Sequence, residues 1–265
     1  MEKREGTMTA IVTGASGGLG AAFCEELAGM GFSLVLTGRD ENKLSELATR
    51  LSSSYRVEVN VVAVDLADPG AVRTLVERTE GAGRPVDVLV NNAGFASYGD
   101  FLSLPEAALD VQLSVLIRAP TALCRAFALV MRERRLGFIL NVSSFTAFVP
   151  TPRYAVYAAA KAYLRHFSEA LAEELFRDGV VVSCLCPGSM LTPFFERAGH
   201  RPDPLITATM MMPREVARRG LRGLFKRKRL IVPGAWNKLG RLGLALLSRR
   251  RAVRLAERFS RQYTG

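Results

Sequence analysis

Histidine and cysteine are scarce in this sequence, and neither is spaced to bind a metal. Of the two histidines among 265 residues, His166 falls within a helical pattern, where we expect it to be packed or capped. His200 falls in a proline-rich loop without a carboxylate or cysteine cluster. The cysteines show neither zinc-ligand spacing nor a C-x-x-C pair; they are Cys24, Cys124, Cys184 and Cys186. We therefore expect no metal, and buried free thiols in a reducing cytoplasm.

Long apolar runs are also missing. No run approaches the roughly 20 consecutive apolar residues that span a bilayer. Residues 1–6 are charged and lack the apolar segment of a signal peptide. No internal repeat or linker interrupts the chain, and 49% hydrophobic residues exclude a disordered protein. The length suits one large α/β domain, so we expect a cytoplasmic protein of that kind.

Acidic residues are nearly absent from the C-terminal region. Residues 225–265 hold 12 Lys/Arg and one Glu, a net charge of +11, so the remaining 24 basic and 24 acidic residues cancel. A basic amphipathic pattern runs through this tail: Leu239, Leu242, Leu246, Leu247, Arg249–Arg251 and Arg254. A solvated face beside an oligomer contact is the favoured interpretation. An anionic membrane surface is second, and an acidic partner such as an acyl carrier is a third. Nucleic acid is least favoured, because no binding motif accompanies the charge.

Apolar strand-like runs alternate with helical patterns along the chain. The runs are 8–13, 32–37, 57–64, 86–90, 138–142, 180–186 and 230–232. Helical patterns follow the glycine-rich segment after the first run and cover about 40–53, a stretch from 68, 105–135 and the region around Tyr157. Strands that are apolar throughout indicate a parallel sheet covered on both faces. We predict a Rossmann-like, doubly wound α/β domain of about seven strands over residues 1–234, with a basic helical extension over 235–265.

A glycine-rich turn follows the first predicted strand. Its sequence is Thr13-Gly14-x-x-x-Gly18-x-Gly20, and it opens a helix. Glycines there let the backbone approach a pyrophosphate, whose charge the helix N-terminus holds. The predicted cofactor contacts in this turn are Gly14, Ser16, Gly18, Leu19 and Gly20. About 20 residues on, at the position where a carboxylate would mark NAD, the chain has Gly38, and Arg39 comes next. An arginine pairs with a 2′-phosphate, so NADP is favoured over NAD.

Tyr157 and Lys161 lie four residues apart on a predicted helix and therefore share one face. A nearby cation favours a phenolate, so the pKa of Tyr157 is expected below its ordinary value of about 10. The neighbouring tyrosines have no such partner, since Ala158 follows Tyr154 by four residues and Phe167 follows Tyr163. Tyr157 is thus the candidate acid/base group.

With these elements in order, the chain resembles the short-chain dehydrogenase/reductase family, in a loosely characterised bacterial branch related to ketoacyl and hydroxysteroid reductases. Asp65-Leu66 follows the third strand, and Asn91-Asn92-Ala93-Gly94 follows the fourth. Ser144 precedes Tyr157 by 13 residues, and Pro187-Gly188 with Thr192 follows the sixth strand. The resemblance covers residues 8 to about 195.

The resemblance implies a role for each of these positions. Ser144 would hold the substrate carbonyl, Tyr157 would deliver the proton, and Lys161 would lower the Tyr157 pKa and hold the nicotinamide ribose. Ser143 is expected to point to the opposite face of the strand. The remaining cofactor contacts would be Asp65 and Leu66 beside the adenine, Asn92, Ala93 and Gly94 along the cleft, and Pro187, Gly188 and Thr192 at the nicotinamide end. NADPH would supply a hydride, and a homodimer or homotetramer is implied.

One position departs from the family pattern. The family places an asparagine on the long central helix, where this sequence has Leu116. The family's asparagine helps to hold a water that links the lysine to solvent, which a leucine cannot do, and Gln112 one turn earlier is a candidate substitute. A nucleotide-binding sensor or scaffold with little turnover is therefore the alternative to an enzyme. A peripheral membrane protein acting through its basic tail is a second alternative.

The loop after Pro187-Gly188 is rich in large apolar side chains. These are Met190, Leu191, Phe194, Phe195, Leu205, Ile206 and Met210–Met212. In the family this region closes over the substrate, and such side chains suit an apolar ligand; ordinary core packing is an equal alternative. The sequence thus predicts an NADP(H)-dependent oxidoreductase that interconverts a hydrophobic ketone or aldehyde and an alcohol.

Overall fold

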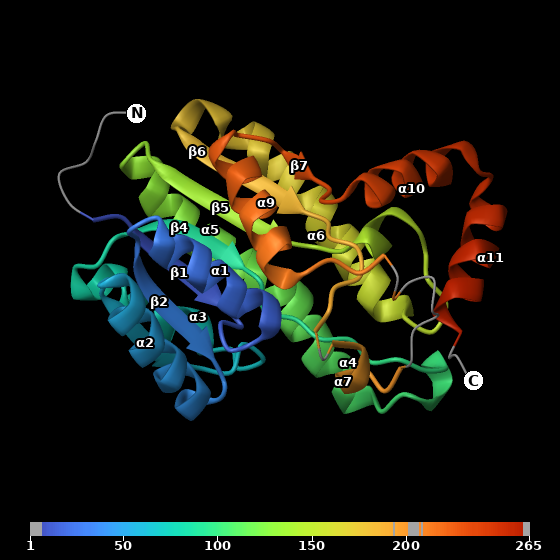
Figure 1. The fold of residues 1–265 in the computed structure, drawn as a ribbon, viewed down its shortest axis with the longest axis horizontal. Helices are drawn as coiled ribbons and strands as arrows, with labels where there is room; N and C mark the ends of the chain where they lie inside the picture. The colour runs from blue at the N-terminus through green and yellow to red at the C-terminus, as the bar shows by residue number, and fades with distance from the viewer. Residues whose placement is uncertain (1–6, 193, 201–206, 208, 262–265) are drawn as a thin grey trace.

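The seven predicted strands form one parallel sheet. The computed structural model describes residues 7–192, 194–200, 207 and 209–261, and its strand order is β3-β2-β1-β4-β5-β6-β7 (Figure 1). The strands are β1 (Thr9–Thr13), β2 (Ser33–Gly38), β3 (Val59–Ala63), β4 (Val86–Asn91), β5 (Gly137–Val142), β6 (Val180–Leu185) and β7 (Leu230–Ile231). The chain reverses its direction of progress between β3 and β4, as in doubly wound folds. The Rossmann-like prediction is confirmed.

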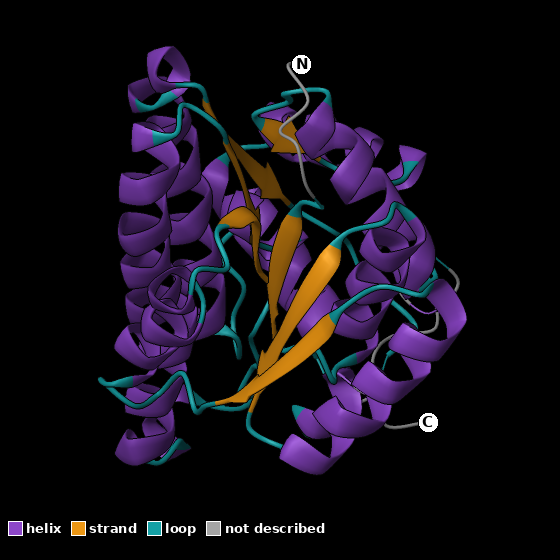
Figure 2. Cartoon of the chain, turned by 90° about the vertical axis from the view of Figure 1, so that its left-hand side faces the viewer, coloured by secondary structure: helices purple, strands orange, loops and turns teal. Residues whose placement is uncertain are grey.

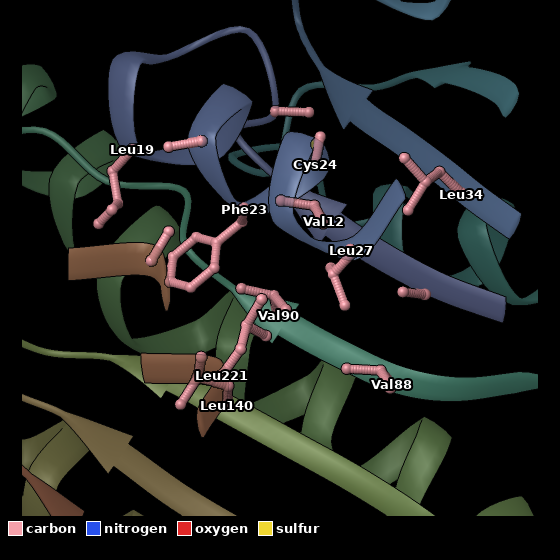
Figure 3. Packing of buried hydrophobic residues seen from close by; sticks show 14 of the residues in the cluster. Val12, Leu19, Phe23, Cys24, Leu27, Leu34, Val88, Val90, Leu140 and Leu221 are labelled. Carbon is pink, nitrogen blue, oxygen red and sulfur yellow. The ribbon is translucent and has the colours of Figure 1, made fainter. Parts of the chain in front are cut away.

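Helices cover both faces of this sheet (Figure 2). The helices are α1 (Gly18–Gly29), α2 (Glu41–Tyr55), α3 (Ala71–Arg78), α4 (Glu106–Leu113), α5 (Ala119–Glu133), α6 (Ala155–Glu174), α7 (Phe194–Arg197), α9 (Pro213–Phe225), α10 (Ala235–Leu246) and α11 (Arg249–Ser260). One core lies under α1, α2 and α9, where Phe23 and Leu221 pack against Val12 and Val90 (Figure 3). The other lies under α3, α5 and α6. Successive strand residues alternate between the two cores, which is why the strands read as apolar throughout.

The sequence predicts only an apolar loop before the last strand, but the structure has helix α9 there. Pro213 opens it, and its buried residues include Val216, Leu221 and Leu224. It packs on α1, and Glu26 of α1 pairs with Arg214 and Arg218 at 3.0 Å each. Basic residues cover its exposed side and obscured the apolar period in the sequence.

The long central helix is continuous but irregular. Between α4 and α5, residues Ser114–Arg118 form a π turn, which inserts one extra residue per turn. By length and composition the stretch Glu106–Glu133 is apolar enough to cross a membrane. Charged residues interrupt it, so it contains no long run of consecutive apolar residues. Its apolar side packs in the core instead: Leu123, Phe127 and Met131 of α5 are at most 1% exposed. One side of this stretch therefore packs on the sheet, while Leu113 and Leu129 on its other side are exposed.

The loops at the carboxyl ends of the strands all lie at one edge of the sheet. The glycine turn follows β1, Arg39 follows β2, Asn92 follows β4, Ser144 follows β5 and Pro187 follows β6. In open parallel sheets this edge, where the strand order reverses, is where ligands bind. The fold therefore gathers residues from 13 to 192 into one region.

Candidate active site

Ser144 and Tyr157 meet at the carboxyl end of β5. Ser144 caps the short turn Phe145–Phe148, where its Oγ accepts a hydrogen bond from the Thr146 amide at 3.2 Å. Tyr157 lies in the first turn of α6 and is buried, and the neighbouring Ser144 side chain lowers the pKa of its hydroxyl. A serine hydroxyl and a buried tyrosine hydroxyl thus lie close together at the end of β5.

Lys161 lies one helical turn after Tyr157 and is also buried. Its Nζ stands 5.7 Å from the centroid of the Tyr157 ring and donates a hydrogen bond to the Val142 carbonyl at 2.7 Å. The neighbouring Ser143 hydroxyl donates to the Lys161 carbonyl at 2.7 Å. Ser143 therefore ties α6 to β5, while Ser144 serves the Tyr157 hydroxyl.

The pKa of Tyr157 differs from the value that its spacing to Lys161 predicts. Burial raises the pKa of Tyr157 to about 12, although the Ser144 hydrogen bond lowers it, and burial lowers the pKa of Lys161 to about 8. The prediction of a depressed Tyr157 pKa was wrong for the protein chain alone. Helical spacing correctly puts the lysine beside the ring, but burial disfavours the charged form of each group.

Leu116 lies directly beside these groups, within the π turn. It is fully buried and belongs to an apolar cluster with Tyr154 and Tyr157. A Cβ placed on Gly94 would stand 2.9 Å from Leu116 Cδ2 and 3.5 Å from Lys161 Nζ. The leucine methyl group and the lysine ammonium group therefore lie close to each other beside Gly94. A hydrocarbon side chain at this position contributes to the desolvation of Lys161.

Gln112 lies on the same helix one turn before Leu116. It is buried, and its amide nitrogen donates to the Phe95 carbonyl at 3.3 Å. Its Oε1 is buried without a hydrogen-bond partner among the described residues. Gln112 therefore presents a buried, unsatisfied acceptor near the site, but the described contacts do not link it to Lys161.

The glycine turn is packed too tightly for side chains. A Cβ on Gly20 would stand 2.1 Å from the Gly14 carbonyl oxygen, and one on Gly18 would stand 2.9 Å from Thr192 Cγ2. The first contact explains why α1 can start so close to β1. The second brings Thr192 from beyond β6 onto the turn, although 174 positions separate it from Gly18 in the sequence. These residues fit a dinucleotide, whose pyrophosphate would lie on the bare backbone at the start of α1.

The end of β4 holds this turn in place. Thr13 Oγ1 accepts hydrogen bonds from the Asn92 and Ala93 amides at 2.9 Å each. The Asn92 side chain donates to the carbonyls of Thr13 and Gly14 at 2.9 and 3.3 Å. Asn92 thus positions the turn, while Gly94 is the exposed residue of this segment.

The predicted adenine end is formed by the carboxyl ends of β2 and β3. Arg39 is exposed, and among the described residues it has no ion-pair partner. Ser16 lies beside Gly38, since its Oγ is 3.8 Å from where a Gly38 Cβ would be. Asp65 is exposed and its carboxylate accepts from the Ala67 amide at 2.9 Å. The guanidinium of Arg39 is therefore free to pair with a phosphate.

The side chains of two predicted cofactor residues are packed in the interior of the protein. Leu19 and Leu66 are each 7% exposed, and their side chains belong to the two apolar cores. At the nicotinamide end Pro187 accepts from the Phe145 amide at 2.7 Å, and Gly188 lies against the Asn237 side chain of α10.

The predicted substrate loop divides into two parts. Phe194 packs on Tyr157 with ring centroids 5.6 Å apart, while Met190 and Met211 pair as an isolated β-bridge and pack on the main core. Leu205 and Ile206 lie outside the described residues. The substrate interpretation therefore suits Phe194, and core packing suits the two methionines.

His200 joins the site through a contact that sequence reasoning missed. It is 4% exposed, and its Nδ1 is 2.8 Å from the Tyr154 hydroxyl. Its ring stacks on Tyr98 with centroids 4.3 Å apart, and burial lowers its pKa. Tyr154 in turn lies 6.1 Å from Tyr157 between ring centroids. Only the fold brings His200 to Tyr154 and Tyr98, which lie 46 and 102 positions earlier in the sequence. No local sequence signal predicts these contacts.

The remaining scarce residues have structural roles or none. His166, expected to be packed or capped, is exposed rather than packed, and its Nε2 lies 3.0 Å from the Arg165 guanidinium. All four cysteines are buried free thiols, as predicted. Among the described residues, no cluster of three His, Cys, Asp or Glu side chains is arranged to hold a metal ion.

Comparison with known proteins gives the family. The family model "short chain dehydrogenase" matches residues 8–203, and the chain belongs to that family. It is 34% identical over 184 residues to an uncharacterized oxidoreductase of Staphylococcus saprophyticus, covering 69% of this chain and 79% of that protein. A short-chain dehydrogenase from Sphingobium yanoikuyae, solved in complex with NADPH, superposes with a TM-score of 0.80 at 29% identity, covering 91% of this chain and 96% of that one.

Other relatives carry names with opposite implications for turnover. A very-long-chain 3-oxoacyl-CoA reductase of Danio rerio is 35% identical over 184 residues, or 67% of this chain and 56% of that protein. An "inactive hydroxysteroid dehydrogenase-like protein 1" of Homo sapiens is 37% identical over 180 residues, or 67% of this chain and 54% of that protein. The chain thus matches just over half the length of these two relatives, and the family name alone does not decide between catalysis and its loss.

Proposed function

We propose that this protein is an NADP(H)-dependent oxidoreductase that interconverts a ketone or aldehyde and an alcohol on a hydrophobic substrate. The observation that carries the proposal is the buried Tyr157 with the Ser144 side chain next to its hydroxyl and Lys161 Nζ 5.7 Å from its ring centroid. The glycine turn, with Thr192 against Gly18, supports a dinucleotide next to that pair. Arg39 is exposed and has no ion-pair partner within the described part of the chain, which supports NADP over NAD, as does the NADPH bound in the Sphingobium relative.

The three side chains would divide the work in the direction of reduction. NADPH, when bound, supplies a hydride to the carbonyl carbon. Ser144 and Tyr157 donate hydrogen bonds to the carbonyl oxygen, and Tyr157 transfers its proton to the forming alkoxide. The Lys161 ammonium stabilises the phenolate that remains, and this attraction is strong because both groups are desolvated. Its pKa of about 8 leaves Lys161 mostly protonated at neutral pH.

The substrate class follows from the surroundings of the Tyr157 hydroxyl. Phe194, Tyr154 and Leu116 form the apolar cluster around it, and Ala198 closes the cluster from the substrate loop. A charged group next to the reacting carbonyl would lose its water there without gaining a described partner, at a cost of several kcal/mol. We therefore propose a substrate that is apolar on both sides of the carbonyl.

The test is NADPH oxidation against a panel of long-chain and bulky ketones and aldehydes. Tyr157→Phe should lower kcat by about 100-fold or more, since it removes only the transferable proton. Tyr163→Phe is the matched control, because this half-exposed tyrosine of the same helix bonds to Thr121 outside the site. Equal rates in wild type and Tyr157→Phe would contradict the proposal.

A nucleotide-binding sensor or scaffold is the second candidate, and Leu116 is the observation that favours it. The family pattern has an asparagine at this position, and here a methyl group of Leu116 lies near Lys161 instead. The relative named as inactive gives this alternative a precedent within the family. NADPH binding with no turnover across the whole panel would support it, whereas turnover abolished by Tyr157→Phe would exclude it.

A further inference from the structure

Helix α10 carries its apolar side chains on the side that faces solvent. Leu239, Leu242 and Leu246 share one face of the helix and are 59, 58 and 81% exposed; we call them the leucine stripe. The opposite face holds Asn237 and Leu244, the two half-buried residues of this helix. An ordinary surface helix would show the reverse pattern. The core of this chain therefore does not account for the leucines.

Helix α11 follows two residues later and has the usual arrangement. Ala252 and Ser260 are buried on its inner side. Its exposed arginines Arg250, Arg251, Arg254 and Arg258 lie on the opposite side, and we call them the arginine face. The leucine stripe and the arginine face thus lie on consecutive helices, both directed away from the body of the protein.

The two helices lie along the edge of the sheet that carries the site (Figure 1). A Cβ on Gly240 would stand 3.3 Å from Cζ of Phe145, the residue after Ser144, and the Asn237 side chain lies against Gly188. At the other end, the Arg261 carbonyl is 3.4 Å from Nε2 of His200 in the substrate loop. The tail is therefore attached to both sides of the candidate active site.

We propose that the leucine stripe and the arginine face dock this protein on an anionic lipid bilayer. A leucine row with an adjacent tryptophan suits the boundary between acyl chains and headgroups, and Trp236 beside the stripe is 73% exposed. Arginines next to it match the charge of anionic headgroups, each strengthening binding about fivefold. Residues 235–261 hold eight Lys/Arg against one Glu, so charge complementarity favours a strongly negative surface.

A second copy of the chain fits this surface less well. A two-fold interface would bring the tail against itself and oppose its cations with more cations. Within the described part of these helices the one ion pair joins Arg261 to Glu257, so the other charges are not neutralised internally. A nucleic acid would meet the arginines but leave the leucine stripe uncovered.

Docking has a consequence for catalysis that rests on the proposed function. Because the tail contacts the segments that carry Ser144 and His200, a docked protein would hold the candidate active site next to the bilayer. An apolar ketone or aldehyde partitions into lipid, so docking would place the enzyme where its substrate is concentrated.

The sole tryptophan of the chain makes the test direct, because Trp236 stands beside the leucine stripe. The full chain is mixed with vesicles of phosphatidylcholine, with or without phosphatidylglycerol, and emission is recorded alongside sedimentation. We expect a blue shift, quenching by brominated acyl chains and co-sedimentation with the anionic vesicles alone. Binding should weaken about tenfold or more between low and high salt, because several cations contribute.

Two double variants separate the contributions. Leu242→Gln with Leu246→Gln should weaken binding about tenfold or more, and Arg250→Gln with Arg254→Gln about 20-fold. All four side chains are exposed, so folding is preserved. Phe176→Gln is the control, since this 60% exposed phenylalanine lies in the turn before β6, at the opposite edge of the sheet.

The outcomes are distinct. Absence of vesicle binding, or equal binding to uncharged vesicles, overturns the proposal. A blue shift that depends on protein concentration without lipid, and no sedimentation, overturns it in favour of a second copy. Vesicle binding is measured without turnover, so its failure is distinguishable from failure of the oxidoreductase proposal.

Discussion

The cofactor half and the catalytic half of the site are built on different principles. In the cofactor half, backbone groups are brought close together and satisfied: Thr13 and Asn92 bond the turn, and Gly20 allows the close approach. In the catalytic half, polar side chains are buried with part of their hydrogen-bonding capacity unused. Lys161 is desolvated, and within the described residues Gln112 Oε1 and the Tyr98 hydroxyl have no partner.

This difference predicts opposite responses to substitution. Changes in the cofactor half should damage binding and stability together, because the same contacts serve both. Changes in the catalytic half can improve stability while they remove function, because buried polar groups cost folding free energy. Four variants test this contrast.

Gly20→Ala should have the largest effect. Its Cβ would stand 2.1 Å from the Gly14 carbonyl oxygen, so the turn must open. We expect the free energy of unfolding to fall by about 4 kcal/mol and NADPH binding to become unmeasurable. Denaturant unfolding and NADPH titration measure both. Gly243→Ala on α10, where a Cβ meets nothing within 4 Å, is the control and should be neutral or slightly stabilising.

Leu116→Asn should lower the free energy of unfolding by about 3 kcal/mol. The change removes a fully buried side chain and places an amide in the cluster around Tyr157. Leu113→Asn, at a 40% exposed position one turn earlier, should cost less than about 1 kcal/mol. Denaturant unfolding compares the two. An equal change in the free energy of unfolding for the two variants would contradict the prediction that Leu116 stabilises the cluster.

Lys161→Met should abolish turnover but raise the free energy of unfolding at pH 7 by about 1–2 kcal/mol. The pKa of Lys161 lies near 8 in the folded protein against 10.5 ordinarily, so the unfolded chain binds more protons between these values. Wild-type stability therefore rises with pH across that window, and the advantage of the variant should shrink from pH 8 to 10.5. Thermal or denaturant unfolding at several pH values measures it. A constant difference would contradict the lowered pKa.

Arg39→Ala should weaken NADPH binding by about 1.5–2 kcal/mol, or roughly 10–30-fold, and leave NADH binding unchanged. Arg56→Ala is the control, since Arg56 is another exposed arginine, at the C-terminal end of α2. Dissociation constants for both nucleotides decide the matter. If wild type binds NADH as well as NADPH, Arg39 is only a surface residue.

Much of this site could be predicted because its signals are local. The glycine turn, the Ser144–Tyr157–Lys161 spacing and the apolar strands each depend on a few neighbouring residues, and helix or strand periodicity then fixes their faces. The apolar strands also predicted the parallel sheet, since both faces of such a sheet are covered.

Other features depend on contacts between distant segments. The basic face of α9 hid its apolar side, and the π turn at Leu116 has no sequence signature comparable to a glycine or proline. His200 reaches Tyr154 only through the fold.

The sequence by itself determined the succession of strands and helices along the chain, the family motifs and the charge of the tail, because these are properties of residue type and spacing. Tertiary structure alone decided how much water surrounds each group. Spacing placed Lys161 one turn from Tyr157, but burial moved both pKa values in the directions opposite to that expected from charge pairing. In the same way, the leucines of α10 were visible as an amphipathic pattern, and only the fold revealed that they face outward. Desolvation depends on everything packed around a group, and no local pattern records it.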